Sequence, residues 1–210
     1  KKAFGDLVRI YGRRFKLVMY DAGAASDGNA DVVCKAGKHY LFQIADERWV
    51  MYRTAALLLR EKKAQAFSTS DISESERVER ELTLMPVRET SKNLTMWSSV
   101  RTIFRVVSKH YEEDKLVSEE TRYFVTSMEA SELPAGKWLE LIILRWGIEV
   151  VHQLLDMEGV FEEDDHPWIT KDARGALAVG LLRRLVLLLM TLHKHIHLRS
   201  EENRDMPWPD

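Results

Sequence analysis

The chain has 210 residues, of which 45% are hydrophobic and 30% charged, and its formal net charge is −2. This composition is ordinary for a soluble globular protein, and the length is sufficient to bury a core without covalent staples. It excludes an intrachain disulfide, because Cys34 is the only cysteine. It also argues against a membrane-spanning helix, because Arg183 and Arg184 interrupt the most apolar stretch, residues 176–192.

Charge is distributed unevenly along the chain. Residues 1–63 contain 13 Lys and Arg against 7 Asp and Glu, and acidic residues predominate in the remainder. A basic first part and an acidic second part would suit a protein that grips phosphates and holds cations. An ordinary solvated surface explains the asymmetry equally well, since net charge informs on association rather than on fold.

The first part of the chain predicts alternating strands and helices. Residues 15–20 form a short apolar run that ends at Asp21, which is typical of a buried strand followed by a turn. A short helix closed by Gly37, a second buried strand and a longer helix are expected next. These three elements occupy residues 29–36, 39–45 and 48–63. The polar residues 68–76 predict a loop.

The middle of the chain is rich in β-formers and predicts strands at residues 77–84, 99–107 and 122–126. The charged residues 112–120 predict a turn between the last two strands. This stretch therefore indicates a β-rich unit inserted into an α/β pattern.

Two helices are expected after the β-rich unit. The first begins near residues 131–134, where Pro134 suits a first helical turn, and continues to Met157. The second runs from about Thr170 to His197. The predicted division is a partial core at residues 1–67, a β-rich insertion at 68–127, helices completing the core at 128–199 and a polar tail at 200–210.

Two places in this pattern could carry chemistry. Asp21 follows a buried strand, where α/β sheets place their ligands, although an Asp before Ala-Gly is also a common turn residue. Arg145, Glu149 and His152 are spaced by four and three residues, so they share one face of a helix. An exposed ion pair is the ordinary explanation of that spacing.

The segment around Glu149 resembles the signature of DDE transposases from bacterial insertion sequences, in the branch with a Tyr-Arg-Glu-Lys-type motif. Residues 145–149 read Arg-Trp-Gly-Ile-Glu and are followed by His152, by Leu-Leu-Asp at 154–156 and by Phe-Glu-Glu-Asp at 161–164. Three more segments resemble parts of the same family. Residues 19–23 resemble the end of the strand that bears the second catalytic aspartate. Residues 97–107 resemble the β insertion, and residues 123–127 resemble the strand that leads into the catalytic helix.

The resemblance implies an RNase H-like catalytic core, with its N-terminal strands missing here and a β-rich insertion before the glutamate-bearing helix. Asp21 and Glu149 would be catalytic and would bind Mg²⁺, with Mn²⁺ as a substitute, for strand cleavage and strand transfer. Arg145 would bind a DNA phosphate or orient the glutamate. His152 and Trp97 would likewise bind DNA or orient the catalytic residues. Trp97 could stack on an unpaired base, although a core tryptophan is the commoner outcome.

The sequence departs from the family pattern in three places. The signature tyrosine falls on Ile142 and the signature lysine on Asp156. No residue matches the first aspartate, because Asp6 is too close to Asp21 for the hairpin and helix that should separate them. We therefore expect a C-terminal catalytic-domain fragment of a DNA transposase that is inactive alone.

Two alternatives remain open at this point. One is a catalytically dead, transposase-derived module that binds DNA or dimerises, and the other is an α/β interaction protein with a fortuitous motif. The expected partner is transposon-end DNA, with a homodimer left open, no membrane, and the bacterial cytoplasm as location. His193 and His197 have the spacing of a zinc-binding pair, but a polar helix terminus explains them better.

Overall fold

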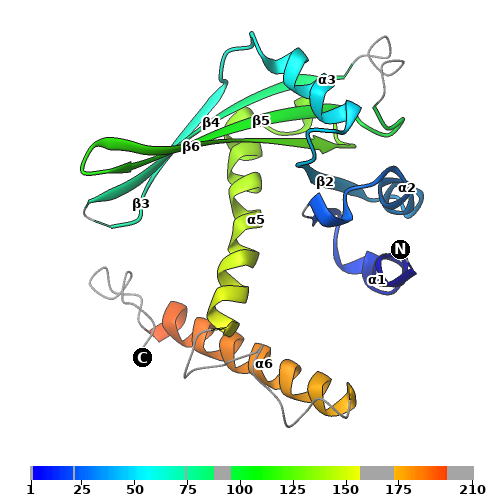
Figure 1. The fold of residues 1–210 in the computed structure, drawn as a ribbon. Helices are drawn as coiled ribbons and strands as arrows, with labels where there is room; N and C mark the ends of the chain where they lie inside the picture. Colours follow the sequence, from blue (N-terminus) through cyan, green and yellow to red (C-terminus); the bar gives the residue numbers. More distant parts are fainter. Residues whose placement is uncertain (1, 21, 74, 88–95, 157–172, 198–210) are drawn as a thin grey trace. The chain divides into compact units, whose positions relative to one another are not determined.

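Six strands form one mixed sheet in the computed structural model, which describes residues 2–20, 22–73, 75–87, 96–156 and 173–197 (Figure 1). The strand order is β1-β2-β6-β5-β4-β3, with β1 and β2 parallel and every other neighbouring pair antiparallel. Together with five α-helices, this sheet makes the described chain a mixed α/β protein, as predicted. The strands are β1 Leu17–Tyr20, β2 His39–Ile44, β3 Ala66–Asp71, β4 Glu76–Pro86, β5 Thr102–Glu112 and β6 Lys115–Thr126.

Helix α2, Asp27–Lys35, connects the parallel strands β1 and β2. The Oγ of Ser26 accepts a hydrogen bond from the Asn29 backbone N–H at 3.2 Å and so caps its first turn. At the other end Gly37 adopts a φ of +68°, and its N–H donates to the Cys34 carbonyl while the Lys38 N–H donates to the Val33 carbonyl. This pair of bonds is a Schellman motif, which favours glycine at the left-handed position.

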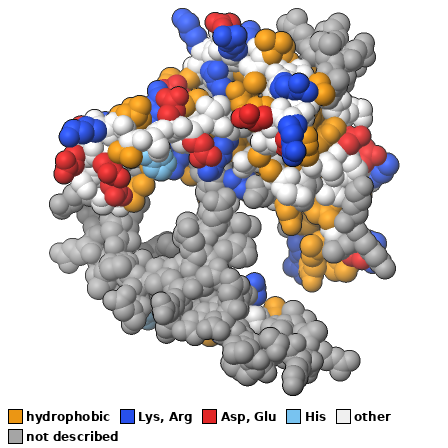
Figure 2. All heavy atoms as spheres, viewed as in Figure 1, with side chains coloured by type: hydrophobic (Ala, Val, Ile, Leu, Met, Phe, Trp, Pro, Cys, Tyr) orange, Lys and Arg blue, Asp and Glu red, His pale blue; other side chains and the backbone are white. Residues whose placement is uncertain are grey.

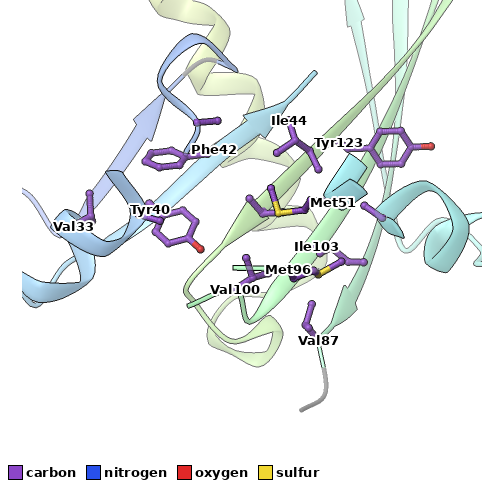
Figure 3. Close-up of a cluster of buried hydrophobic side chains, with 14 of the residues drawn as sticks. Val33, Tyr40, Phe42, Ile44, Met51, Val87, Met96, Val100, Ile103 and Tyr123 are labelled. Atoms are coloured by element: carbon purple, nitrogen blue, oxygen red, sulfur yellow. The ribbon is translucent and has the colours of Figure 1, made fainter. Parts of the chain in front are cut away.

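One face of the sheet is covered by apolar side chains from the helices α1, Lys2–Tyr11, α2 and α3, Val50–Leu59. We call it the helix-covered face. Alternate residues of β2 point into it, and Figure 3 shows their side chains among those of neighbouring elements. Its central residues are Tyr40, Phe42, Ile44, Met51, Ile103 and Val125.

The opposite face of the sheet receives the first turns of helix α5, Ala135–Asp156, and we call it the α5 face. Trp138 is fully buried, with its ring 5.0 Å from that of Phe104 on β5. Its Nε1–H donates to the Ala130 carbonyl at 3.2 Å, which satisfies its one polar group. Leu139 and Ile142 continue the buried stripe at helical spacing.

The prediction of a loop over residues 68–76 was wrong for residues 68–71 and 76, which belong to strands. Strand β3 runs through this stretch to Asp71 and pairs antiparallel with β4, from Ala66 opposite Leu82 to Asp71 opposite Arg77. It lies at the edge of the sheet, and most of its side chains are exposed. A polar edge strand lacks apolar alternation, so its pairing partner rather than its sequence pattern makes it a strand.

The prediction of a turn over residues 112–120 was correct only for Glu113 and Asp114. Strand β5 extends to Glu112 and β6 begins at Lys115, which leaves Glu113 and Asp114 as a two-residue turn. Both have positive φ, 47° and 64°, as a type I′ hairpin turn requires. The visible face near this end of the hairpins carries acidic and basic side chains side by side (Figure 2). The ion pairs Arg77–Asp114, Arg77–Glu79 and Lys109–Glu81 explain this mixture.

The described chain divides into two units, Lys1–Arg145 and Trp146–Asp210. The first contains the whole sheet. The second contains the last turns of α5 and the helix α6, Ala173–His197. Both helices were predicted, although Thr170, the expected cap of the second, lies outside the described residues. None of the helices in the described part of the chain has the length and hydropathy that a membrane crossing requires.

Candidate functional site

The parallel pair β1–β2 brings the carboxyl ends of two strands to one edge of the sheet. Tyr20, the last residue of β1, lies opposite Phe42 of β2. Asp21 is the next residue in the sequence but lies outside the described residues. This edge is where open α/β sheets bind ligands, because backbone and side-chain groups converge there without covering helices.

Asp46, two residues beyond β2 in the sequence, is another carboxylate close to this edge. It is hydrogen-bonded within its own loop. Its Oδ1 accepts hydrogen bonds from the Arg48 backbone N–H at 3.0 Å and from Arg48 Nε at 2.9 Å. The hydrogen bond to the Arg48 side chain lowers the pKa of the Asp46 carboxyl. Asp46 therefore acts as an ion-paired turn residue.

Arg145 is a buried charged residue on the α5 face. Only 6% of it is exposed, and its guanidinium carbon lies 5.9 Å from the centre of the Phe124 ring on β6. Phe124 is fully buried, and so is Ile142, one helical turn before Arg145. Burying an arginine has a desolvation cost, which its contact with the Phe124 ring offsets in part.

Gln43 lies beside the same ring. It is directly opposite Phe124 in the β2–β6 register, so both side chains point to the α5 face. The Oε1 of Gln43 is buried and makes no hydrogen bond with any part of the chain that the structure describes. Arg145 and Gln43 thus both lie beside Phe124 on the α5 face, and we call these three residues the Arg145 patch.

Glu149 and His152 are on α5, four and seven residues after Arg145. The backbone there is helical, as predicted, but the side chains of both residues lie outside the described ones. The convergence of Asp21 and Glu149 on shared metal ions therefore stays a prediction. Among the side chains that the structure describes, no three His, Cys, Asp or Glu come together as a metal site.

Trp97 is half-buried at the rim of the helix-covered face. Its ring centre lies 6.2 Å from that of Tyr40 and 6.4 Å from that of Phe42, both in edge-on arrangements. These contacts correspond to the core role that was the commoner expectation for this tryptophan. The exposed part of the ring leaves stacking on a base as a prediction.

The sequence pointed to Arg145 but not to Gln43. Residue 43 stands in the run His-Tyr-Leu-Phe-Gln-Ile, where one amide among apolar residues was the available signal. Its position beside Phe124 depends on the pairing of β2 with β6, across more than 80 residues of sequence.

The described geometry thus supplies a parallel β-α-β unit and a buried arginine on a helix that continues to a glutamate. In the sequence, Asp21 directly follows the first strand of that unit. Carboxylates could hold a hard divalent cation, and an arginine could orient a carboxylate or bind a phosphate. The chain matches no protein-family model, and no curated protein matches it.

Proposed function

We propose that the chain is the C-terminal part of the catalytic domain of a DDE transposase with an RNase H-like fold. The observation that carries the proposal is the order of the elements around the signature. A parallel β1–α2–β2 unit has a first strand that ends one residue before Asp21 in the sequence, and antiparallel strands extend the same sheet up to the helix of Arg145 and Glu149. This order is the one that the motif resemblance implies.

Asp21 and Glu149 would hold the Mg²⁺ ions, together with a further carboxylate that has no counterpart in this sequence. These side chains suit Mg²⁺, because both offer the hard carboxylate oxygens that this ion prefers. When bound, the ions activate a water or a DNA 3′-hydroxyl and stabilise in-line displacement at a phosphodiester.

The burial of Arg145 supports a positioning role. A guanidinium that is 6% exposed and stacked over Phe124 has little surface to offer to DNA. From the preceding helical turn it can instead restrict the carboxylate of Glu149, since residues four apart on a helix are neighbours. His152 is three residues beyond Glu149 on the same helical face.

Calorimetric titration of Mn²⁺ into the purified chain tests this proposal. We expect binding by the wild type that is lost in Asp21→Asn and in Glu149→Gln, because each removes one charged ligand. Glu140→Gln is the matched control, since Glu140 is exposed on the same helix and paired with Lys137 at 2.7 Å. Equal binding in all four proteins would overturn the proposed site.

A catalytically dead, DNA-binding or dimerising module is the alternative outcome. It would show transposon-end DNA binding or self-association without any Mn²⁺ binding that depends on Asp21 and Glu149.

A further inference from the structure

A second candidate site lies near the amino end of β2. A hollow of about 350 Å³ is formed there by three segments that are distant in the sequence. They are the turn after α2, the residues before β5 and the residue after β6. Its lining residues are Cys34, Gly37, Lys38, His39, Ser99, Arg101 and Ser127.

The charged side chains in this lining are cationic. Lys38 and Arg101 both line the hollow, and none of the lining residues that the structure describes is a carboxylate. Lys38 forms no ion pair with any residue that the structure describes. Glu129 lies beside Arg101, with 3.6 Å between its Oε1 and the Arg101 Nε, and this exposed pair neutralises only part of the positive charge.

The Arg101 guanidinium is held in place by backbone contacts. One terminal nitrogen, Nη1, donates to the Ser98 carbonyl at 2.9 Å and to the Val100 carbonyl at 3.2 Å. The backbone N–H of Arg101 donates to the Thr126 carbonyl at 2.8 Å, which ties this loop to the end of β6. An arginine braced in this way loses less conformational freedom when it binds an anion.

Two serine hydroxyls add neutral donors. The Oγ of Ser127 accepts from the Tyr40 backbone N–H at 3.3 Å and lies 3.2 Å from the His39 Nδ1. The Oγ of Ser99 lies 3.0 Å from the buried phenol of Tyr40. When Tyr40 and His39 act as donors, both serines keep their own hydroxyl hydrogens for a ligand.

We propose that this hollow binds a phosphate group. Two cations and two hydroxyls, with no carboxylate among the described lining residues, match a doubly charged, tetrahedral oxyanion with several acceptor oxygens. The volume leaves room for an organic group or a nucleic-acid backbone attached to the phosphate. The inference is independent of the proposed transposase function, because it uses neither Asp21 nor Glu149.

The single cysteine provides the test. Cys34 lines the hollow, so a bound phosphate should slow its reaction with a neutral disulfide such as 4,4′-dithiodipyridine. The rate is measured against inorganic phosphate at constant ionic strength. We expect saturable protection in the wild type, and about a tenfold higher half-protecting concentration in Lys38→Gln, from the loss of one charge-assisted contact.

Lys35→Gln is the matched control. Lys35 is exposed, lies on α2 together with Cys34, and is paired with Asp31 outside the hollow. It should behave like the wild type. The rise in thermal midpoint with phosphate provides a readout that does not depend on the thiol, and it should be smaller in Lys38→Gln. Absence of protection and of a thermal shift, or identical effects in Lys38→Gln and the wild type, would overturn the site.

Two further arms of the same assay identify the source of the phosphate. Protection by phenyl phosphate but not by a short DNA duplex indicates a small phosphate ester. Protection by the duplex, lost in Lys38→Gln, indicates a backbone phosphate. Protection by acetate equal to that by phosphate would overturn selectivity for phosphate.

Discussion

The two faces of the sheet are built from the same strands but differ in chemistry. The helix-covered face buries aromatic and aliphatic side chains, and its buried phenol, Tyr40, is hydrogen-bonded to Ser99. The α5 face buries a tryptophan and two phenylalanines, but also Arg145 and the amide oxygen of Gln43. The comparison indicates that the α5 face differs in burying a charged group and an amide oxygen that has no hydrogen-bond partner among the described residues.

The largest effect should come from the helix-covered face. Phe42→Ala should lower the free energy of unfolding by about 3–5 kcal/mol, because a fully buried ring leaves a cavity. Denaturant unfolding measures the change. Phe67→Ala is the control, since Phe67 is 71% exposed and its loss should change stability by about 0.5 kcal/mol or less. Similar effects of both substitutions would contradict the assignment of the core.

Two buried residues of α5, Ile142 and Arg145, should differ in how their replacement affects stability and function. Ile142→Ala should cost about 2–5 kcal/mol, because it empties a fully buried site. Arg145→Met should lower the free energy of unfolding by less than Ile142→Ala does, because a side chain of similar size leaves no cavity of that kind.

Under the proposed function, Arg145→Met should nevertheless abolish strand transfer in the full transposase. Arg145→Lys should restore little of it, because lysine lacks the planar fork. A strongly destabilised Arg145→Met protein would show instead that the arginine is structural.

Replacing Gln43 should have a smaller effect on the free energy of unfolding, and of the opposite sign. Gln43→Met should raise the free energy of unfolding by about 1 kcal/mol, because it removes a buried acceptor that has no partner among the described residues. Gln65→Met is the contrast, since the Gln65 Oε1 accepts from the Leu84 backbone N–H at 3.1 Å. That variant should lose stability. The same sign of change in both proteins would contradict the difference between the two amides.

The smallest effect concerns alkaline pH. Burial raises the pKa of the Tyr40 phenol above its ordinary value, so the native state disfavours ionisation that the unfolded state allows. The resulting stability is fully present below about pH 10, the unfolded pKa, and falls as the pH rises above it. Between pH 9 and 11 the unfolding free energy of Tyr40→Phe should therefore fall less steeply. Parallel slopes would contradict this assignment.

The alternating strands and helices of the chain could be predicted from sequence, because apolar runs and turn residues are local signals. The strands β1 and β2, the helices α2, α3, α5 and α6, and the turn at Gly37 were found in this way. Helix α1 was not predicted. The edge strand β3 and the outer arms of the β5–β6 hairpin were misjudged, because their polar residues become strands only by pairing with neighbours.

The candidate sites divide in the same way. By itself the sequence determined the spacing of Arg145 and Glu149 on one helix and the position of Asp21 after an apolar run, since both depend on neighbouring residues. Only the tertiary structure decided that Gln43 and Arg145 both lie beside Phe124. It also decided that Lys38, Arg101 and Ser127 line one hollow. These groupings depend on strand pairing across long stretches of chain, and no local pattern encodes them.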